Sequence, residues 1–404
     1  MFARPHFHAA AASLQAENKP CGQLTVAKGT GLVAMSMRQL ALGAAALALF
    51  AASSAASAQS YTFAFLEGLG GSYSVANGIN NAGQVVGDSY TVGGNTYTDH
   101  ATLWTGTKPT DLGTLGGSDS HAYGINNAGQ VVGYAANAAG VHHATLWNGT
   151  TTTDLGTLGG IDSYAYGINN AGQIVGSSRT TGYGDLHATL WNGTTPTDLG
   201  ALGGRLSEAY GINDAGQIVG TSNPRYSYSL LRATLWNGTT PTVFGSLDSF
   251  SVAKGINNLG QVVGSSLSIL SSAADAMLWN GTMPTELVGR LGSYSSSYGY
   301  GINTAGQIVG SSAGHATLWN GTTPTDLNNY LDPISVSASW VLQGANGIND
   351  AGSIVGKAFN PATSESRAFL LSVTAVPEPQ TYALMLAGIG MVGFAIRRRK
   401  QARI

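Results

Sequence analysis

Four histidines recur at one position of a repeated pentapeptide, and their side chains are of a type that ligates metals. The pentapeptide reads HATLW each time, and the histidines are His100, His143, His187 and His315. Zinc holds its nitrogen ligands at about 2.0 to 2.1 Å, whereas residues that recur once per repeat stand on separate units. His142 adds only an isolated neighbour. We therefore interpret these histidines as hydrogen-bonding residues at strand starts, and predict neither a metal nor a cofactor.

Carboxylates and one serine motif are the other residues that could support catalysis. The repeated carboxylates are Asp111, Asp154, Asp198 and Asp326. They too occur once per repeat, and no run resembles an EF-hand loop. A catalytic carboxylate pair must lie within about 10 Å, which the sequence alone does not reveal. Residues 310–314 read GSSAG, but the G-x-S-x-G elbow needs a following helix, which is absent from the sequence pattern. We predict no catalytic residue and no enzyme.

These residues belong to a repeated unit, which is marked by seven copies of a phrase that reads GINNAGQVVG in its first copy. The copies begin at Gly78, Gly124, Gly167, Gly211, Gly255, Gly301 and Gly347. Asn-Asn-Ala-Gly suits a type I turn between two strands. The Asn-Gly that follows HATLW is a hairpin signal and leads to a fourth strand around Thr-Asp-Leu. Each unit therefore predicts four short strands.

The period favours one architecture. A unit of about 45 residues with four strands is typical of a β-propeller blade, whereas the coils of a β-solenoid are usually shorter. The seventh unit lacks a fourth strand, and residues 61–66 supply one without the three that should precede it. When the first strand of the repeat region completes the last unit, neither end of the region leaves an exposed sheet edge. The sequence predicts an all-β, seven-bladed β-propeller over residues 59–374, with the N-terminal strand completing the last blade.

The loops between the second and third strands vary in length, whereas the Asn-Asn-Ala-Gly and Asn-Gly turns barely change. In four-stranded blades these variable loops share one face. Several carry tyrosines, which we predict as a candidate ligand rim: Tyr90, Tyr97, Tyr134, Tyr183, Tyr226 and Tyr228. Exposed aromatic residues on loops held by a rigid scaffold suit binding, and sugars offer an apolar ring face. The alternative is that these tyrosines only pack the loops.

Both ends of the chain carry targeting patterns. Residues 37–58 have a basic start, an apolar stretch and an A-x-A site at Ala56 and Ala58, which predicts a signal peptide cut by signal peptidase. Residues 1–36 fit no part of it and suggest a misassigned start or a leader extension. Residues 381–396 form an uncharged apolar run before a basic cluster. We expect a C-terminal transmembrane helix that leaves the repeats outside the cytoplasm.

The tail, residues 375–404, closely resembles the PEP-CTERM sorting signal of Gram-negative bacteria. The residues that carry the resemblance are Pro377, Glu378, Pro379, Arg397, Arg398 and Arg399, with the apolar run between them. This resemblance implies processing by an exosortase after transient anchoring in the inner membrane. Residues 66–372 are similar to the HAF family of extracellular repeats. That resemblance implies a secreted or cell-surface location and no particular chemistry.

The net charge of the repeat region argues against one class of partner. Residues 59–376 hold 9 of the 18 basic and 18 of the 20 acidic side chains, a net charge of −9, which disfavours nucleic acid. Cys21, the only cysteine, precedes this region. We therefore expect a non-catalytic secreted or cell-surface protein that binds or organises extracellular polysaccharide, as in a biofilm matrix. The alternatives are a purely structural surface protein without a specific ligand and a polysaccharide-acting enzyme.

Overall fold

The computed structural model describes residues 60–93, 96–225, 230–244, 250–267, 273–281, 283–287, 291, 295–374 and 388–390. Nearly all of them lie in one compact unit, Ala58–Val376, which is built from β-strands. The predicted leader, signal peptide and sorting residues lie outside the described residues, as does the apolar run except for residues 388–390, which are helical. Within the described residues no helix is long and apolar enough to cross a membrane.

The strands form seven antiparallel groups of four, six of them consecutive in sequence. The first group is β2 (Gly70–Ile79), β3 (Val85–Gly93), β4 (Thr96–Thr105) and β5 (Lys108–Asp111). The second is β6 (Gly116–Ile125), β7 (Val131–Asn137), β8 (His142–Asn148) and β9 (Thr151–Asp154). The third is β10 (Ser163–Ile168), β11 (Gln173–Arg179), β12 (Leu186–Asn192) and β13 (Thr195–Asp198).

The remaining groups continue the same order. The fourth is β14 (Gly203–Ile212), β15 (Ile218–Pro224), β16 (Arg232–Asn237) and β17 (Thr240–Val243). The fifth is β18 (Ser251–Ile256), β19 (Gln261–Leu267), β20 (Ala274–Asn280) and β21 (Met283–Glu286). The sixth is β22 (Ser297–Ile302), β23 (Gln307–Ser312), β24 (His315–Asn320) and β25 (Thr323–Asp326). Short helices η2 (Leu327–Tyr330) and α2 (Pro333–Ser337) follow.

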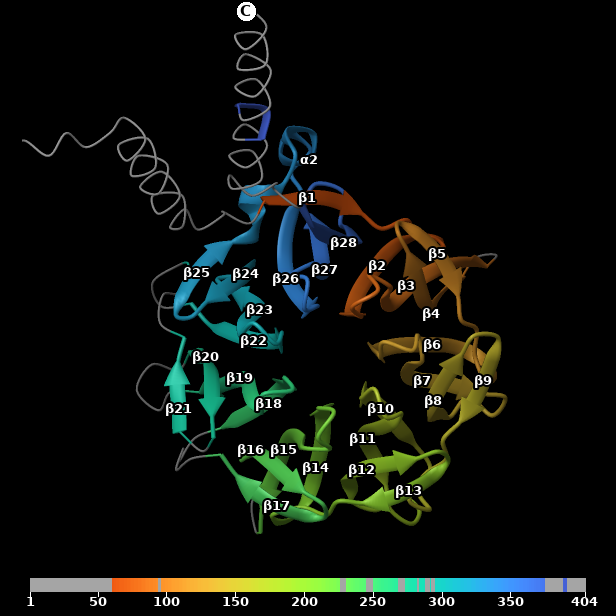
Figure 1. Cartoon of the computed structure of the whole chain (residues 1–404). Coiled ribbons are helices and arrows are strands. Elements are labelled where there is room, and N and C mark those ends of the chain that lie inside the picture. Colours follow the sequence, from red (N-terminus) through yellow and green to blue (C-terminus); the bar gives the residue numbers. More distant parts are fainter. Residues whose placement is uncertain are drawn as a thin grey trace, which may run out of the picture. The chain divides into compact units, whose positions relative to one another are not determined.

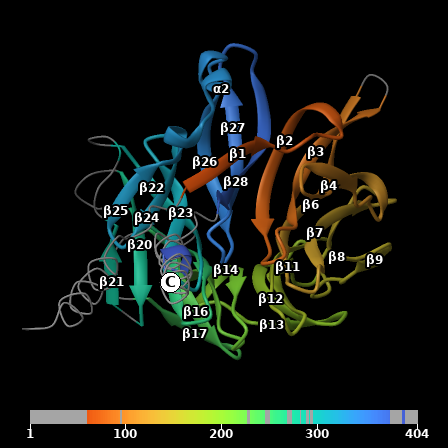
Figure 2. The same ribbon diagram turned by 45° about the horizontal axis from the view of Figure 1, so that its top comes forward.

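The seventh group is completed by the strand from the other end of the chain. It comprises β26 (Val341–Ile348), β27 (Ile354–Asn360), β28 (Glu365–Thr374) and β1 (Ser60–Phe65). Phe63 pairs with Leu371 and Phe65 with Phe369, in antiparallel register. Figures 1 and 2 both show β1 lying beside β28. The predicted pairing of residues 61–66 with the strand around Phe369 is confirmed.

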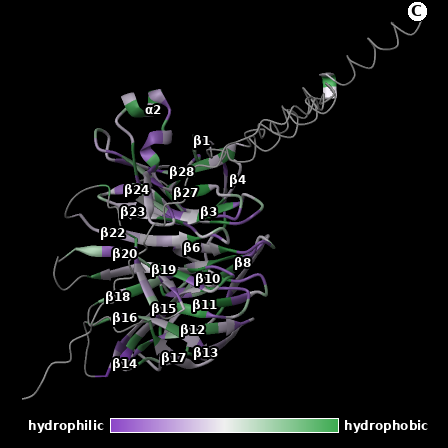
Figure 3. Ribbon diagram, turned by 60° about the vertical axis from the view of Figure 1, so that its left-hand side comes forward, coloured by the Kyte–Doolittle hydropathy of each residue, from purple (hydrophilic) through white to green (hydrophobic). Residues whose placement is uncertain are grey.

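The seven groups are arranged around a common centre, with the first strand of each group innermost (Figure 1). Side chains between neighbouring groups make the core. One cluster joins Val132 and Ala144 of the second group to Ala165, Ile174 and Trp191 of the third. In Figure 3, hydrophobic and hydrophilic stretches alternate along the strands instead of gathering in one layer. The apolar surface of each sheet is therefore buried against its neighbours, which is the main source of stability here.

The tryptophans of the HATLW-type strands are the largest side chains of that core. Six of them are at most 1% exposed: Trp104, Trp147, Trp191, Trp236, Trp279 and Trp319. Burying an aromatic side chain of this size contributes about 3 kcal/mol. The repetition of Trp in the third strand is therefore explained by packing between sheets.

Candidate functional site

The repeated histidines and aspartates hydrogen-bond to each other within each unit. The ring Nδ1 atom lies 2.8 Å from the Asp carboxylate for His100–Asp111 and His187–Asp198, and 2.7 Å for His143–Asp154 and His315–Asp326. Burial opposes ionisation of Asp326, but hydrogen bonds from His315 and Asn328 outweigh it and lower its pKa. Among the described residues, no three His, Cys, Asp or Glu side chains gather as metal ligands. These pairs connect the third strand to the fourth.

The GSSAG sequence does not form a nucleophile elbow. Ser311 and Ser312 end β23, a two-residue turn follows, and His315 begins β24. The Ser311 hydroxyl lies 3.2 Å from the hydroxyl of Tyr300. A strand-to-strand hairpin offers no helix N-terminus to stabilise an oxyanion, so this motif has no catalytic setting.

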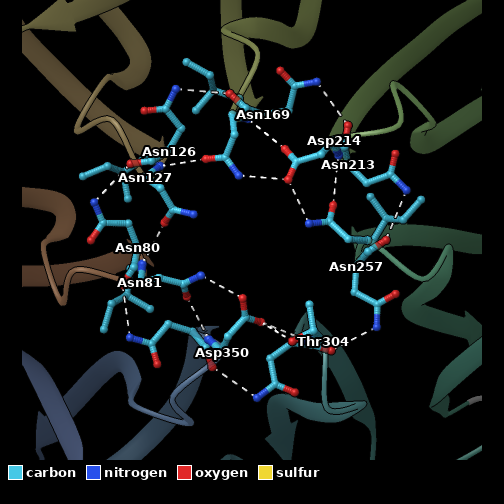
Figure 4. A pocket seen from close by; sticks show the side chains of 18 of the residues that line it. Asn80, Asn81, Asn126, Asn127, Asn169, Asn213, Asp214, Asn257, Thr304 and Asp350 are labelled. Atoms are coloured by element: carbon cyan, nitrogen blue, oxygen red, sulfur yellow. Dashed lines mark hydrogen bonds between the residues drawn. The ribbon is translucent and has the colours of Figure 1, made fainter.

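One end of the central space is encircled by asparagines from the Asn-Asn-Ala-Gly turns (Figure 4). In each turn the first asparagine donates a hydrogen bond from Nδ2 to the carbonyl of its counterpart in the next unit. From Asn169 this bond reaches Asn213 at 3.1 Å, and from Asn349 it returns to Asn80 at 3.1 Å. The seven members are Asn80, Asn126, Asn169, Asn213, Asn257, Asn303 and Asn349.

The second residue of each turn surrounds a polar cavity of about 170 Å³ at the same end. Two carboxylates stand there. Asp214 accepts from Asn170 and Asn258 Nδ2 at 2.9 and 2.8 Å, and Asp350 accepts from Asn81 Nδ2 at 2.7 Å. Burial opposes ionisation of Asp350, but its hydrogen bonds outweigh burial and lower its pKa. The polar groups of this end are thus engaged in holding the units together.

The inner strands carry a different set of side chains toward the other end. In each unit the residue before Gly-Ile is a β-bulge, because the register skips it, as between Ala165 and Gly167. Bulges re-aim a side chain and are enriched next to functional sites. The bulged residues differ from unit to unit, and they are Asn77, Tyr123, Tyr166, Tyr210, Lys254, Tyr300 and Asn346.

Two further positions vary beside each bulge, and they are register partners on the first and second strands. In unit order these pairs are Val75–Asp88, His121–Tyr134, Tyr164–Ser177, Glu208–Thr221, Val252–Ser265, Tyr298–Ser311 and Gly344–Lys357. We call these pairs and the seven bulged residues the variable belt. The positions next to the belt are nearly always small residues, because there is no room for a larger one. At Gly176, for example, an added Cβ would lie 1.9 Å from the Tyr164 carbonyl oxygen. The belt is where the repeat is free to change.

An acidic and imidazole cluster occupies the belt at the first two units. His121 Nδ1 lies 3.4 Å from Asp88 and its Nε2 lies 3.9 Å from Asp99, and Asn77 donates to Asp88 at 3.1 Å. Burial raises the pKa of both carboxyl groups, more than His121 lowers it. Burial lowers the pKa of His121, but the two carboxylates more than reverse this and the net shift is upward. One buried oxygen of Asp99 has no hydrogen-bond partner among the described residues.

Tyrosine rings continue the belt across the second, third and fourth units. The Tyr134 ring centroid lies 5.0 Å from that of Tyr164 and 5.9 Å from that of Tyr123. Tyr123 in turn lies 5.5 Å from Tyr166, which lies 5.4 Å from Tyr210. Burial, followed by the nearby Asp88 charge, raises the pKa of Tyr123 to about 12. These phenols stay neutral at physiological pH and can donate hydrogen bonds.

The structure divides the six predicted rim tyrosines. Tyr90 and Tyr134 lie in strands β3 and β7 rather than in loops, half-buried, with Tyr90 4.8 Å from Tyr73 and Tyr134 4.8 Å from His121. Tyr97 lies in strand β4, so the loop assignment is wrong for three residues. Tyr183 is 83% exposed on a hairpin. Tyr226 and Tyr228 lie outside the described residues.

Most of the belt was missed by sequence reasoning, which looked for variation in loop length. Of its residues only Tyr134 was predicted to bind a ligand, and Ser311 was considered only as part of the GSSAG motif. The available signal was the residue before each Gly-Ile, which changes among Asn, Tyr and Lys immediately before a nearly constant phrase. The proximity of Asp88, Asp99 and His121 had no such signal, because it depends on strand register and on the neighbouring unit.

Comparisons with known proteins give a sorting motif and distant structural likenesses. A puromycin-hydrolysing peptidase of Mycobacterium tuberculosis aligns at 10% identity, with a TM-score of 0.46, over 79% of this chain and 57% of that chain. Dipeptidyl peptidase 4 of Porphyromonas gingivalis aligns at 10% identity, with a TM-score of 0.39, over 70% of this chain and 50% of that one. This chain thus spans about half the length of these structures.

No curated protein matches the sequence. The family comparison concerns the tail. Residues 375–400 match the PEP-CTERM protein-sorting motif, and this range includes all six predicted sorting residues. The motif implies processing by an exosortase and a secreted or cell-surface protein of a Gram-negative bacterium. The C-terminal residues of this chain carry the PEP-CTERM protein-sorting motif.

Proposed function

We propose that the chain is a seven-bladed β-propeller of HAF-type repeats that binds extracellular polysaccharide through its variable belt, without catalysis. The fold proposal is supported by the seven four-stranded groups and by the circle of asparagine hydrogen bonds that returns from Asn349 to Asn80. Pairing of β1 with β28 leaves the last group with its full set of four strands. Radial repetition of this kind leaves only short, protected sheet edges.

The observation that carries the binding proposal is the tyrosine row of the belt. Five rings, from Tyr134 to Tyr210, follow one another at 5.0 to 5.9 Å across three units. Polar groups stand beside them, with Glu208 accepting from the Tyr210 hydroxyl at 2.7 Å. Sugars present an apolar ring face and a hydroxyl rim, so a row of phenols next to carboxylates matches both.

Location follows from the tail and the leader. We propose that signal peptidase cuts after Ala58, that the apolar run of residues 381–396 holds the chain in the inner membrane as a helix, and that exosortase then releases or re-anchors it outside. The match of residues 375–400 to the sorting motif supports this order. A protein exported in this way meets the polysaccharides of the cell surface and the biofilm matrix.

A glycan array with belt variants tests the binding proposal. Tyr164→Ala should weaken binding to the polysaccharides that the wild type retains roughly tenfold, since losing a central aromatic contact costs about 1–2 kcal/mol. Tyr330→Ala is the matched control, because Tyr330 packs on Tyr61 in the seventh unit, away from the belt. Failure of the wild type to retain any glycan would favour the purely structural alternative.

A polysaccharide-acting enzyme is the second candidate, and Asp88 and Asp99 are the observation that favours it. Two carboxyl groups with raised pKa values on either side of one imidazole are a possible acid–base pair. If the protein only binds, incubating the wild type with the glycans that it retains should release no new reducing ends. Turnover that disappears in both Asp88→Asn and Asp99→Asn would establish the enzyme instead.

A further inference from the structure

Lys254 is the one lysine among the seven bulged residues, and it lies in β18. Its ammonium stands 3.4 Å from the centre of the Tyr210 ring. Both side chains line a cavity of about 210 Å³ whose other walls are the glycines and isoleucines of the Gly-Ile pairs, from Gly78 to Ile348. A cation over a phenol ring is favourable, but the ring satisfies none of the three N–H donors of an ammonium.

The other bulged side chains have hydrogen-bond acceptors within the protein. Tyr210 donates to Glu208 at 2.7 Å, Tyr300 pairs with Ser311 at 3.2 Å, and Asn346 donates to the Ala76 carbonyl at 2.9 Å. Among the described residues, no hydrogen bond or ion pair is formed by the Lys254 ammonium. Glu208, whose charge acts on Lys254, is hydrogen-bonded to tyrosine hydroxyls. Burial lowers the pKa of Lys254, which Glu208 partly offsets.

We infer that Lys254 binds a carboxylate of the polysaccharide, so that the ligand is an acidic, uronate-type chain. A half-buried ammonium with three unused donors is stabilised most by an anion that accepts charge-assisted hydrogen bonds. The glycines and isoleucines of the cavity wall offer no side-chain acceptor, so a ligand entering the cavity can supply one. The phenol ring of Tyr210 flanks the ammonium and can contact the face of the same sugar. This inference rests on the proposed polysaccharide-binding function.

Calorimetric titration of the purified full-length chain tests the inference with two matched ligands. One is a hexamer of galacturonate, and the other is its methyl ester, which has the same sugar chain without the charges. A hexamer of mannuronate repeats the comparison with another sugar. We expect the wild type to bind at least one acidic hexamer roughly tenfold to a hundredfold more tightly than the corresponding ester, as a charge-assisted hydrogen bond contributes.

Two variants assign this preference to one side chain. Lys254→Met keeps the length of the side chain and should abolish the preference for the acid while still binding the ester. Lys108→Met is the matched control: it removes the same charge from the outer strand β5, where Lys108 pairs with Glu67 at 2.7 Å, and it should keep the preference. Equal binding of acid and ester by the wild type, or an unchanged preference in Lys254→Met, would overturn the inference.

Further measurements separate the remaining outcomes. If Lys254→Met fails to fold, the rate of acetylation of Lys254 in the wild type replaces it, and an acidic hexamer should slow that rate at least fivefold while the ester does not. Inorganic phosphate or acetate that competes as strongly as the hexamer would show a free-anion site and contradict the inference. Binding of neutral glycans through the belt, without a preference for the acidic hexamers, would contradict this inference and leave the proposed function standing. Absence of all glycan binding would sink the proposed function as well.

Discussion

At the scale of single residues, the most repeated polar side chains are used in structure and the least repeated ones are candidates for function. His187 and Asp198 pair with each other, and Asn169 bridges two units. By contrast, Lys254 is the only lysine among the seven bulged residues, and Asp88 is the only aspartate among the second-strand residues of the belt. The interpretation of the repeated histidines as hydrogen-bonding residues is confirmed, since each forms a hydrogen bond with the aspartate of its own unit. Sequence reasoning had no means to find Asp99 beside His121, which requires the strand register.

Replacing Asn169 tests the asparagine circle. Its side chain is buried and makes four hydrogen bonds: from the Ala171 and Gln173 amides to Oδ1, and from Nδ2 to Gln173 and to the Asn213 carbonyl. Asn169→Ala should lower the free energy of unfolding by about 4 kcal/mol, because each of the four bonds contributes roughly 1 kcal/mol. Chemical denaturation measures this. The neighbouring Asn170→Ala removes two solvent-exposed hydrogen bonds, one from the Asn127 amide and one to Asp214, and should therefore cost less than Asn169→Ala; equal losses would contradict the account.

The carboxylate of Asp326 predicts an acid-sensitive contribution to stability. Its pKa in the folded protein is lowered, so it stabilises the fold above the unfolded value of about 3.9, and this contribution is lost as pH falls through the folded pKa. Asp326→Asn should therefore be less stable than the wild type at pH 6, with the difference shrinking steadily below pH 4. Denaturation at several pH values checks this. A difference that grows toward pH 3 would show the opposite sign.

At the scale of elements, turn chemistry and repeat phase predicted most of the strands. The Asn-Gly and Asn-Asn-Ala-Gly turns set hairpins with glycine in the left-handed region, such as Gly172 at φ +78° and Gly193 at φ +61°. The strands of the first second-to-third hairpin extend through the segment that was assigned to a loop, because β3 ends at Gly93 and β4 begins at Thr96. Cross-strand pairs extend this hairpin beyond the repeated phrases. The bulges went unnoticed because a register skip leaves no mark in the hydrophobic pattern.

Strand β1 should be required for the seventh group. Tyr61, Phe63 and Phe65 pack against its core, with Phe65 4.8 Å from Trp340. Deleting residues 59–66 should destabilise the protein by at least about 3 kcal/mol, because apolar cover is lost and the β28 edge is left unpaired. Thermal melting with light scattering should show a lower transition and aggregation. Thr62→Ala, on the exposed side of the same strand, is the control and should melt like the wild type.

At the scale of the whole molecule, the repeat supplies a scaffold, and the proposed function depends on a belt that only the complete set of units provides. The seven-unit count and the contribution of β1 followed from the sequence, because repeat phase is visible in a single chain. The composition of the belt did not, because it combines three residues from each of seven distant units. The sorting motif at residues 375–400 was recognised from its three ordered parts.

Sorting gives a prediction for the whole chain. Replacing residues 377–379 by alanines should leave a precursor that keeps its basic C-terminus, because the processing enzyme reads the Pro-Glu-Pro sequence. Mass spectrometry of the C-terminal peptide and membrane fractionation check this. A matched variant with residues 362–364 replaced by alanines, in a turn of the seventh group, should be processed normally. An identical mature C-terminus in the wild type and the Pro-Glu-Pro variant would refute sorting through this motif.

The most direct test of the account is whether the two ends of the repeat region are joined in solution. With Cys21 replaced by serine, the full chain has no other cysteine, so Thr62→Cys and Ser372→Cys, which are register partners in β1 and β28, can form only one intramolecular disulfide. Facing residues of antiparallel strands lie within the usual Cα separation of a disulfide. We predict rapid, near-complete oxidation, faster migration without reductant and a higher melting temperature. A control pair, Thr62→Cys with Thr151→Cys in β9, should stay reduced. Thiols that remain free in the first pair, or that oxidise equally in both, would contradict the proposed closed ring on which the belt depends.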